Sequence, residues 1–202
     1  MAEHYFSPEP SAEHAPREVS ITFEGKKYTF LTDAGVFSRD GFDEGSALML
    51  SAALDELSGD VLDLGCGWGP VGILAAKLCP DCRVTLLDVN ARACHLAAEN
   101  ARRHGVNVQV LCQDGLSELS PSFDWILLNP PIRAGKETVY RLFRESSARL
   151  KPSGCLVIVI RKQQGAPSAR RYLETLFSQV TLRCRKKSYH VYFCLGGNGN
   201  DI

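Results

Sequence analysis

The stretch Asn129-Pro130-Pro131 follows the apolar run WILL at 125–128 and combines residue types that could do chemistry at the end of a strand. Neither proline has a backbone N–H, so the pair must end a strand rather than continue it. The asparagine side-chain carbonyl and the proline backbone carbonyls are hydrogen-bond acceptors on one stiff turn. The alternative is a strand that simply ends at Pro-Pro, and the motif alone does not exclude it.

A glycine-rich loop follows an earlier apolar segment. It reads DLGCGWGP from Asp63 to Pro70, and glycines let a backbone turn tightly and approach a ligand closely. A dinucleotide-binding loop has the spacing G-x-G-x-x-G, with the pyrophosphate at a helix N-terminus. Here the spacing is G-x-G-x-G, and Pro70 removes one amide from the start of the next helix. The loop therefore predicts a nucleoside ligand without a pyrophosphate.

Two aspartates follow the next two apolar segments. Asp88 lies 25 residues after Asp63 and could accept hydrogen bonds from both ribose hydroxyls. Asp114 could accept a hydrogen bond from an adenine amine. Each has an ordinary alternative, a helix cap for the first and a turn for the second. The glycine loop and both acids at three successive strand ends are far more specific together than any one of them.

These residues need a scaffold that gathers the ends of strands. Predicted strands lie at 60–64, 83–87, 108–112, 125–128 and 155–160. Predicted helices, which alternate with them along the chain, lie at 70–78, 90–104, 136–150 and 167–177. Such alternation predicts an α/β fold with a mostly parallel sheet and helices on both faces, which binds ligands beyond the carboxyl ends of its strands. A hairpin within 19–31 and a helix at 45–57 precede this unit, and strands at 180–185 and 189–195 close it.

The basic residues are concentrated in one part of a chain that has 23 Lys+Arg and 23 Asp+Glu. Residues 129–187 hold 14 basic residues and three acidic ones, which suggests a polyanionic partner on one face. The alternative is solvated helix faces without a partner. The basic residues at 183–187 could lie at the other end of the sheet, in a simple solvated turn.

Composition and cysteine usage suggest a soluble protein of a reducing compartment. No apolar run approaches the roughly 20 residues that span a bilayer, and the N-terminal segment has acids and prolines where a signal peptide would need an apolar centre. We therefore predict a cytoplasmic protein without membrane contact. Of the eight cysteines, those in apolar or helical stretches are predicted to be small buried thiols in a reducing compartment, namely Cys94, Cys112, Cys155, Cys184 and Cys194. The pair Cys79 and Cys82 has no second pair to complete four zinc ligands, so no metal site is predicted.

The strand-end motifs resemble those of class I S-adenosylmethionine-dependent methyltransferases. D-x-G-x-G-x-G matches their first motif, Asp88 their ribose acid and Asp114 their adenine-side acid. Three more stretches, at 37–46, 129–136 and 161–168, together with His4-Tyr5-Phe6, are similar to small single-domain relatives of the 16S ribosomal RNA guanine-N2 methyltransferase C family, which share the "methyltransferase small" domain.

The resemblance implies a fold and a division of the chain. The fold is a Rossmann-like, mostly parallel sheet of seven strands with an antiparallel last strand, preceded by an N-terminal β-hairpin. The methyltransferase domain spans 18–195, with a flexible N-terminal arm at 1–17 and a flexible tail at 196–202. Fuller-length members of the family carry a second domain without cofactor, for which this chain has no room.

The resemblance also implies S-adenosylmethionine as the cofactor and assigns roles to residues. The cofactor-binding residues are Asp63, Gly65, Cys66, Gly67, Gly69, Asp88, Val89, Asp114, Gly115 and Asn129. The catalytic residues are Asn129, Pro130, Pro131 and Ile132. The substrate-binding residues are Phe37, Arg39, Arg133, Lys136, Arg161 and Lys162.

In this family, [N/D/S]-P-P followed by an aromatic residue marks methylation of amine nitrogens of bases or of glutamine. Here Ile132 takes the aromatic position, so stacking on a base would have to come from Phe37, Phe42 or Tyr140. The stretch between Cys112 and Cys155 lacks the cysteine nucleophile of cytosine-C5 methylation.

We therefore expect methylation of the exocyclic N2 amine of a guanine in 16S ribosomal RNA, free or in a small-subunit precursor. The motifs also leave open protein glutamine, DNA adenine, or an RNA-binding module with a vestigial cofactor pocket. A nicotinamide dehydrogenase is disfavoured by Pro70.

Overall fold

The computed structural model describes residues 12–119 and 122–197. Most of the expected arm at 1–17, with His4-Tyr5-Phe6, and most of the tail at 196–202 lie outside the described residues. The part of the arm that is described contacts the domain, because the Arg92 guanidinium donates to the Ala12 carbonyl at 2.8 Å and the Ala15 N–H to Asp33 Oδ1 at 2.6 Å.

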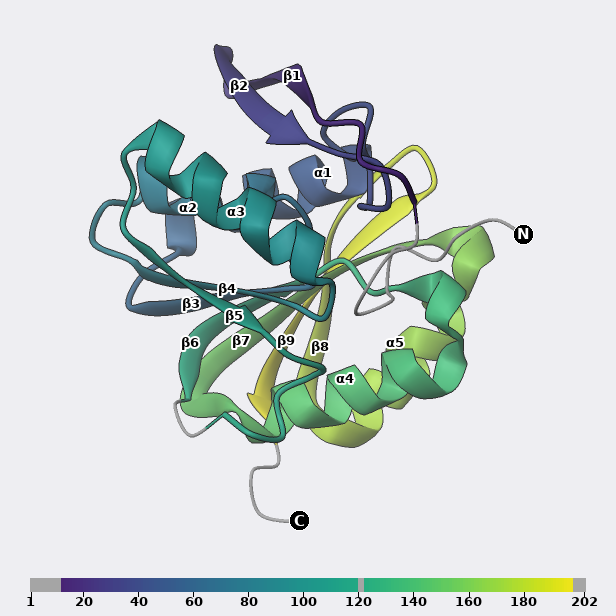
Figure 1. The fold of residues 1–202 in the computed structure, drawn as a ribbon. Coiled ribbons are helices and arrows are strands. Elements are labelled where there is room, and N and C mark those ends of the chain that lie inside the picture. The colour runs from purple at the N-terminus through teal and green to yellow at the C-terminus, as the bar shows by residue number, and fades with distance from the viewer. Residues whose placement is uncertain (1–11, 120–121, 198–202) are drawn as a thin grey trace.

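A seven-stranded sheet forms the centre of the molecule (Figure 1), with the strand order β5-β4-β3-β6-β7-β9-β8. Its strands are β3 (Asp60–Leu64), β4 (Arg83–Asp88), β5 (Val108–Cys112), β6 (Phe123–Leu128), β7 (Leu150–Arg161), β8 (Phe177–Lys186) and β9 (Tyr189–Gly197). Strands β3 to β7 pair in parallel, and β9 runs antiparallel to both β7 and β8. This arrangement confirms the predicted Rossmann-like sheet with an antiparallel last strand.

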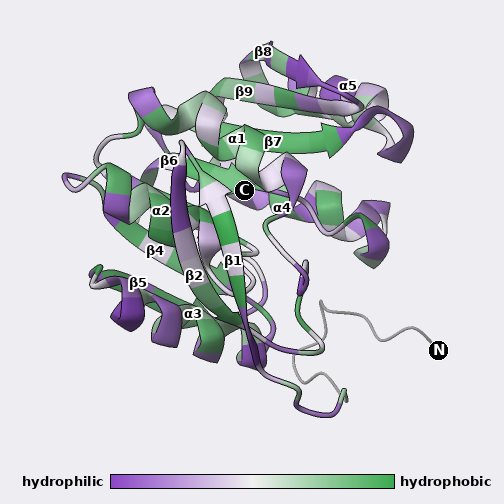
Figure 2. Ribbon diagram, turned by 90° about the horizontal axis from the view of Figure 1, so that it is seen from above, coloured by the Kyte–Doolittle hydropathy of each residue, from purple (hydrophilic) through white to green (hydrophobic). Residues whose placement is uncertain are grey.

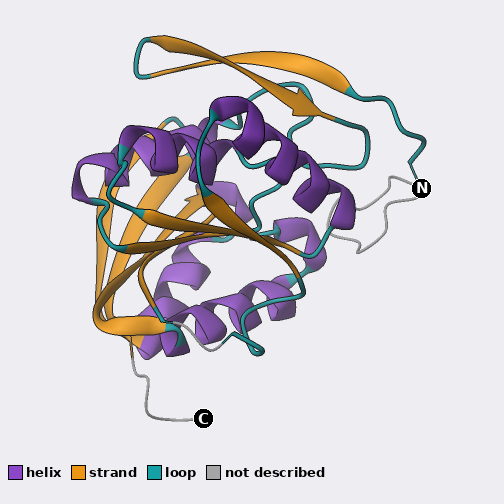
Figure 3. Cartoon of the chain, turned by 60° about the vertical axis from the view of Figure 1, so that its left-hand side comes forward, coloured by secondary structure: helices purple, strands orange, loops and turns teal. Residues whose placement is uncertain are grey.

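Helices cover both faces of the sheet (Figures 1 and 3). One face carries α1 (Glu44–Ala53), the short helix η1 (Leu54–Glu56), α2 (Pro70–Leu78) and α3 (Ala91–His104). The other face carries α4 (Lys136–Ala148) and α5 (Ala166–Leu176). Two further short helices, η2 (Ile132–Ala134) and η3 (Lys162–Gln164), follow β6 and β7. Because η2 and η3 follow the carboxyl ends of parallel strands, both lie at the edge where ligands are expected.

The sheet is buried on both faces, and its alternating side chains divide between two cores. Val157 and Val159 of β7 pack toward α1 to α3, whereas Leu156 and Ile158 pack toward α4 and α5. In the central strands β3, β4, β6 and β7, double burial explains the mostly continuous apolar residues (Figure 2). The edge strands β5 and β8 are more exposed. Burial of a large aliphatic side chain is worth about 1.5–3 kcal/mol, so the two cores hold the strand ends in fixed positions.

The N-terminal hairpin, β1 (Arg17–Phe23) and β2 (Lys26–Thr32), lies over the helical layer of α1 to α3 (Figure 1). Its turn residues Glu24 and Gly25 both have positive φ, at 45° and 71°, as a two-residue type I′ turn requires. Asn100 of α3 bonds both backbone groups of Leu31, at 2.7 and 2.9 Å, and also donates to the Trp68 carbonyl at 2.8 Å. One buried amide thus fastens the hairpin to the glycine loop.

Several predicted boundaries move in the structure. β7 begins at Leu150 rather than 155, and α4 ends at Ala148. All eight cysteines are free thiols. Cys112 is exposed rather than buried as predicted, because it ends the edge strand β5. Among the described residues, no helix is both long and apolar enough to cross a membrane.

Candidate active site

The glycine loop after β3 is shaped for close approach of a ligand. Gly65, Gly67 and Gly69 have φ values of 75°, 56° and 89°, a region that L-residues with side chains rarely occupy. A methyl group added to Gly65 or Gly67 would meet no protein atom within 4 Å, whereas one on Gly69 would come within 2.8 Å of Ile73. The first two glycines therefore border open space, and the third allows close packing inside the fold.

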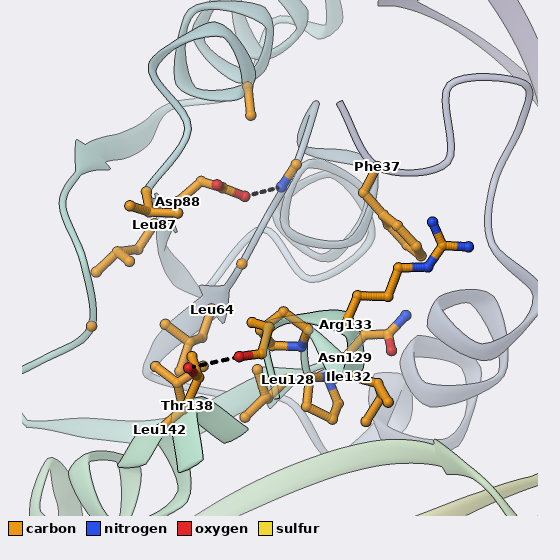
Figure 4. Close-up of a pocket in the computed structure, with 18 of the residues that line it drawn as sticks. Phe37, Leu64, Leu87, Asp88, Leu128, Asn129, Ile132, Arg133, Thr138 and Leu142 are labelled. Carbon is orange, nitrogen blue, oxygen red and sulfur yellow. Dashed lines mark hydrogen bonds between the residues drawn. The ribbon is translucent and has the colours of Figure 1, made fainter. Parts of the chain in front are cut away.

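Two buried aspartates hold this loop. Asp63 Oδ2 accepts the Gly72 N–H at 2.9 Å, which fixes α2 behind the loop. Asp88 Oδ2 accepts the Gly67 N–H at 2.8 Å, and its Oδ1 accepts the Asn90 N–H at 2.9 Å (Figure 4). Burial raises the pKa of Asp63 to about 7 and also raises the pKa of Asp88. A nearby positive charge would therefore stabilise the ionised form of both carboxyl groups.

Asp114 follows β5 and borders the same open space. Its Oδ1 accepts a hydrogen bond from Arg141 of α4 at 2.6 Å, and Arg141 also bonds Glu145 at 3.0 Å. Glu145 in turn accepts the Leu116 N–H at 2.7 Å. No local pattern in the sequence indicates this network, which ties the loop after β5 to α4 and occupies one oxygen of Asp114.

The turn after β6 is a compact series of backbone hydrogen bonds. Pro131 has φ −74° and ψ 78°, and the Ile132 N–H donates to the Pro130 carbonyl at 2.9 Å, which together form an inverse γ-turn. The Pro131 carbonyl accepts the Ala134 N–H at 2.9 Å. One lone pair of the Pro130 carbonyl is thus used within the turn, and one remains for a ligand.

The orientation of Asn129 is set by two side chains at the start of α1, one from its N-cap residue and one from its first turn. Asn129 Nδ2 donates to Asp43 Oδ2 at 3.0 Å and to Ser46 Oγ at 2.9 Å. Asp43 also caps α1, since its Oδ2 accepts the Ser46 N–H at 2.8 Å. A carboxylate only accepts hydrogen bonds, so the amide nitrogen must face Asp43. The Asn129 carbonyl oxygen is left without a hydrogen-bond donor among the described residues.

These strand ends surround one cavity of about 700 Å³ (Figure 4). Of the predicted site residues, the cavity is lined by Phe37, Gly65, Gly67, Asp88, Val89, Asp114, Gly115, Asn129, Pro130, Pro131, Ile132, Arg133 and Arg161. An adjoining smaller cavity is lined by Phe37, Gly65, Gly67 and Asn129 as well, and adds Asp63 and Cys66. Residues separated by more than 100 positions in the sequence thus line the same cavity.

Four predicted site residues line neither cavity. Gly69 packs inside the fold, as described above. Arg39 is directed toward the N-terminal segment and donates to the Ala15 carbonyl at 3.2 Å. Lys136 lies over the Tyr140 ring at 5.1 Å, and Lys162 is exposed on η3. These three basic residues therefore lie outside the cavity, where they could reach only the parts of a substrate that remain outside it.

The three aromatic residues considered for stacking differ in position. Phe37 and Arg133 both line the cavity, on the side where Asn129 lies (Figure 4). Phe42 packs edge-on against Phe23 at 5.9 Å and lines only the smaller cavity. Tyr140 stacks on Tyr172 at 4.0 Å, away from the cavity. Phe37 is therefore the aromatic side chain of the three that lines the larger cavity.

Sequence reasoning missed Asp43 and Tyr189. Asp43 lies three residues before Ser46, a spacing that indicates a helix cap but no contact with Asn129. Tyr189 begins β9 and lines the cavity, with its ring beneath the Arg161 guanidinium at 4.6 Å. Its ring lies so close to α1 that a methyl group on Gly45 would come within 2.7 Å of it. No local signal marks Tyr189, because only the pairing of β9 with β7 brings it to the site.

The position of the last strand pair also corrects an expectation. Tyr189 pairs with Arg161 of β7 and with Lys186 of β8, and the Lys162 N–H donates to the Ser188 carbonyl at 2.8 Å. The β8–β9 turn, with the basic residues around it, therefore lies at the same edge of the sheet as the cavity and not at the other end. The antiparallel direction of β9 is the reason.

Comparisons with known proteins agree with this geometry. A family model described as methyltransferase small domain matches residues 27–193. The uncharacterized protein YbxB of Bacillus subtilis is 43% identical over 195 residues, covering 95% of this chain and 97% of its own length. Ribosomal RNA small subunit methyltransferase C of Mannheimia succiniciproducens is 36% identical over 166 residues, covering 80% of this chain and 49% of its own length.

Among solved structures, the T. thermophilus 16S rRNA N2 G1207 methyltransferase, in complex with AdoMet and guanosine, matches with a TM-score of 0.80 and 25% identity. The match covers 89% of this chain and 50% of that protein. This chain thus spans about half the length of both methyltransferases and nearly the full length of YbxB.

Proposed function

Because this chain belongs to the methyltransferase small domain family, we propose that it methylates the exocyclic N2 amine of a guanine in small-subunit ribosomal RNA. It is an S-adenosylmethionine-dependent methyltransferase related to the ribosomal RNA small subunit methyltransferase C proteins. The substrate is the proposed part. The main support for this substrate is the orientation of Asn129. Its side-chain nitrogen is already hydrogen-bonded to Asp43 and Ser46, so its side-chain oxygen is available to accept an N–H from the substrate.

The residues around the cavity suit S-adenosylmethionine. Open space over Gly65 and Gly67 leaves room for a ligand against the backbone, and the Asp88 carboxylate at the end of β4 is placed for ribose hydroxyls. The buried carboxylates of Asp63 and Asp88, whose pKa values burial raises, favour a cationic ligand. When bound, the cofactor supplies an electrophilic methyl group on a sulfonium.

Asn129 and Pro130 would position the amine. An exocyclic amine of a base is a weak nucleophile because its lone pair is delocalised into the ring. The Asn129 carboxamide oxygen and the free lone pair of the Pro130 carbonyl can each accept one N–H, which directs the nitrogen lone pair toward the methyl group and stabilises the positive charge that develops on nitrogen. The γ-turn at Pro131 holds the two acceptors in place. No strong base is needed, because the methylated, charged amine loses its proton readily.

The cavity favours nitrogen over carbon as the methylated atom. Carbon methylation at cytosine C5 would require a thiolate nucleophile close to the transferred methyl group. Of the eight cysteines, Cys66 is the one that lines either cavity, and burial raises the pKa of its thiol. A protonated thiol is a poor nucleophile, so the side chains at the end of β6 support amine chemistry.

Two observations support RNA as the substrate class. Two relatives whose matches cover at least 80% of this chain are named for methylation of small-subunit ribosomal RNA. Arg133 and Arg161 line the cavity, where positive charge can hold the phosphates around a base that has been turned out of its stack.

The test is a comparison of modified nucleosides in ribosomal RNA from cells with and without the gene, by mass spectrometry. Loss of N2-methylguanosine at one position, restored by the purified enzyme and S-adenosylmethionine, is the expected result. An unchanged nucleoside profile, together with methyl transfer to a glutamine in protein or to adenine in DNA, would overturn the assignment to RNA.

A further inference from the structure

The β8–β9 turn extends the cavity wall outward along the edge of the sheet. The register of the strands places Arg161, Tyr189 and Lys186 in one row across β7, β9 and β8. The next row contains His190 and Arg185. Strands lie about 4.8 Å apart, so this edge continues for about 10 Å beyond β7. In Figure 1 the β8–β9 turn and the start of α5 lie on the same side of the molecule.

The cations on this edge have few anionic partners. Lys187 pairs with Glu44 at 2.7 Å, and Arg161 lies over Tyr189 and donates to its hydroxyl. The side chains of Lys162, Arg185 and Lys186 are exposed and make no ion pair or hydrogen bond with the described residues. Five cations thus meet two carboxylates at this edge, those of Asp43 and Glu44.

The contrast with other basic residues is informative. Lys151 bonds Asp60 and Asp124, both at 2.7 Å, and Arg170 bonds Glu174 at 2.8 Å. Arg183, two residues before Arg185, pairs with Glu56. Five of the 14 basic residues of 129–187 therefore have acidic partners, mostly from outside that segment. Lys162, Arg185 and Lys186 are among those without such a partner, and they lie at the edge that continues from the cavity.

Mutual repulsion makes this edge unfavourable without an anion. The pKa of His190 is lowered, first by burial and then by the positive charges of Arg185 and Lys162. Clustered positive charges without counterions raise the free energy of the folded protein. A bound polyanion neutralises these charges, and the release of its condensed cations further favours binding. Two of the three side chains are lysines, whose ammonium is a point charge on a flexible stem, and the Arg185 guanidinium can bind one phosphate with two hydrogen bonds. These groups suit phosphates, which fix the position of a nucleic acid without reading its sequence.

We propose that Lys162, Arg185 and Lys186 form a phosphate-binding tract for the RNA strand on one side of the target nucleotide. The tract begins where Arg161 and Tyr189 line the cavity, and it runs outward across β9 and β8. The proposal rests on the proposed function, because it assumes that the substrate is RNA. It gives the chain its own RNA contact within the methyltransferase domain.

The double substitution Arg185→Gln/Lys186→Gln tests the tract. The matched control is Lys26→Gln/Lys27→Gln, which removes two exposed charges at the tip of the β1–β2 hairpin. Binding of a short single-stranded oligoribonucleotide is measured by fluorescence anisotropy over a range of KCl concentrations. Two lost contacts should reduce the slope of log K against log[salt] by about 1.4, and affinity should fall about tenfold at physiological salt.

The two variants are also compared in S-adenosylmethionine binding and in methylation of ribosomal RNA. If the tract exists, cofactor affinity is unchanged in both variants. The KM for RNA rises about tenfold, with unchanged kcat, in the Arg185/Lys186 variant but not in the control. If the wild-type enzyme methylates guanine and both variants match it in affinity, KM and slope, the tract is wrong and the proposed function stands. If the wild-type protein transfers methyl only to another substrate class, the proposed function fails, and the tract, which is defined for an RNA substrate, fails with it.

Discussion

At the scale of single residues, the orientation of Asn129 is the feature that supports the proposed role of the Asn-Pro-Pro turn. Its amide nitrogen is occupied by Asp43 and Ser46, so its oxygen is the group left to accept a hydrogen bond. An acceptor that is already aligned requires no reorganisation when charge develops on the amine. A free asparagine at a strand end would flip between both orientations and lose this advantage.

Replacing Asn129 by alanine removes the side-chain acceptor and leaves the glycine loop intact. We expect kcat to fall about 100-fold to 1,000-fold, the usual effect of losing one aligned hydrogen-bond partner of the transition state. The dissociation constant for S-adenosylmethionine, measured by calorimetry, should change little. Methyl transfer to RNA at the wild-type rate would show that the amine is held by other groups.

Asp43 is a positioning residue, and its substitutions separate orientation from helix capping. Asp43→Ala removes the partner of Asn129 Nδ2 and the N-cap of α1, and should lower kcat about tenfold or more while cofactor affinity stays the same. Asp43→Asn keeps a side-chain carbonyl that can accept both the Ser46 and the Asn129 hydrogens, so it should restore kcat as well as the melting temperature. If Asp43→Ala lowers only the melting temperature, by the roughly 1 kcal/mol of a lost cap, Asp43 has no part in orienting Asn129.

At the scale of elements, the turn from β3 into α2 is built around backbone conformations that few residues allow. Gly65 and Gly67 leave open space on the cavity side, and Pro70 begins α2 at the position where a missing N–H costs least. The buried Asp63 carboxylate fixes the distance between this turn and α2 through the Gly72 N–H. The loop is therefore a rigid surface rather than a mobile lid.

Gly67→Ala and Gly105→Ala form a matched pair for this loop. Both positions have positive φ, at 56° and 64°, and at both a methyl group would meet no protein atom within 4 Å. Each change should therefore cost about 1–2 kcal/mol of stability through backbone strain alone. Only Gly67→Ala places a methyl group in the cofactor cavity, so it alone should weaken S-adenosylmethionine binding, by about tenfold or more in calorimetry. Equal cofactor affinities would mean that the ligand does not approach this loop closely.

At the scale of the whole molecule, stability and the site are linked through a buried carboxyl group. Burial raises the pKa of Asp63 to about 7 from its ordinary value of 3.8. The native state then binds its proton more tightly than the unfolded state does, so the stability that protonation contributes is present below pH 3.8 and is lost as pH rises toward 7. Carboxyl groups such as Asp60 and Glu99, whose pKa values are lowered by arginine and lysine partners, act in the opposite direction.

Asp63→Asn isolates this contribution, because an amide oxygen can still accept the Gly72 N–H. The difference in unfolding free energy, variant minus wild type, should increase from about pH 4 to about pH 7 and then level off. Urea titrations of both proteins without cofactor, at several pH values, measure it. A difference that is constant over this range would show that Asp63 ionises normally in the folded protein.

The sequence alone determined most of the fold and much of the cavity wall. Alternating apolar segments identified the strands and helices of the central unit, because period and length are local properties. Asp88, Asn129 and the glycine loop were predicted together because the residues after successive parallel strands must meet at one edge. The same logic could not place Arg39, Lys136 or Lys162 inside or outside the cavity, since that depends on side-chain direction and on neighbouring loops.

Only the tertiary structure decided how the charges are distributed and what orients the acceptor. The basic segment 129–187 looked uniform in sequence, yet Glu44, Glu56, Asp60, Asp114 and Asp124, all outside it, neutralise part of it. Part of the remaining charge lies beside the cavity because β9 turns back antiparallel to β7 and brings Tyr189 next to Arg161. Asp43 reaches Asn129 across 86 positions of sequence. Such contacts depend on strand order and register, which are set by packing of the whole domain and not by any local pattern.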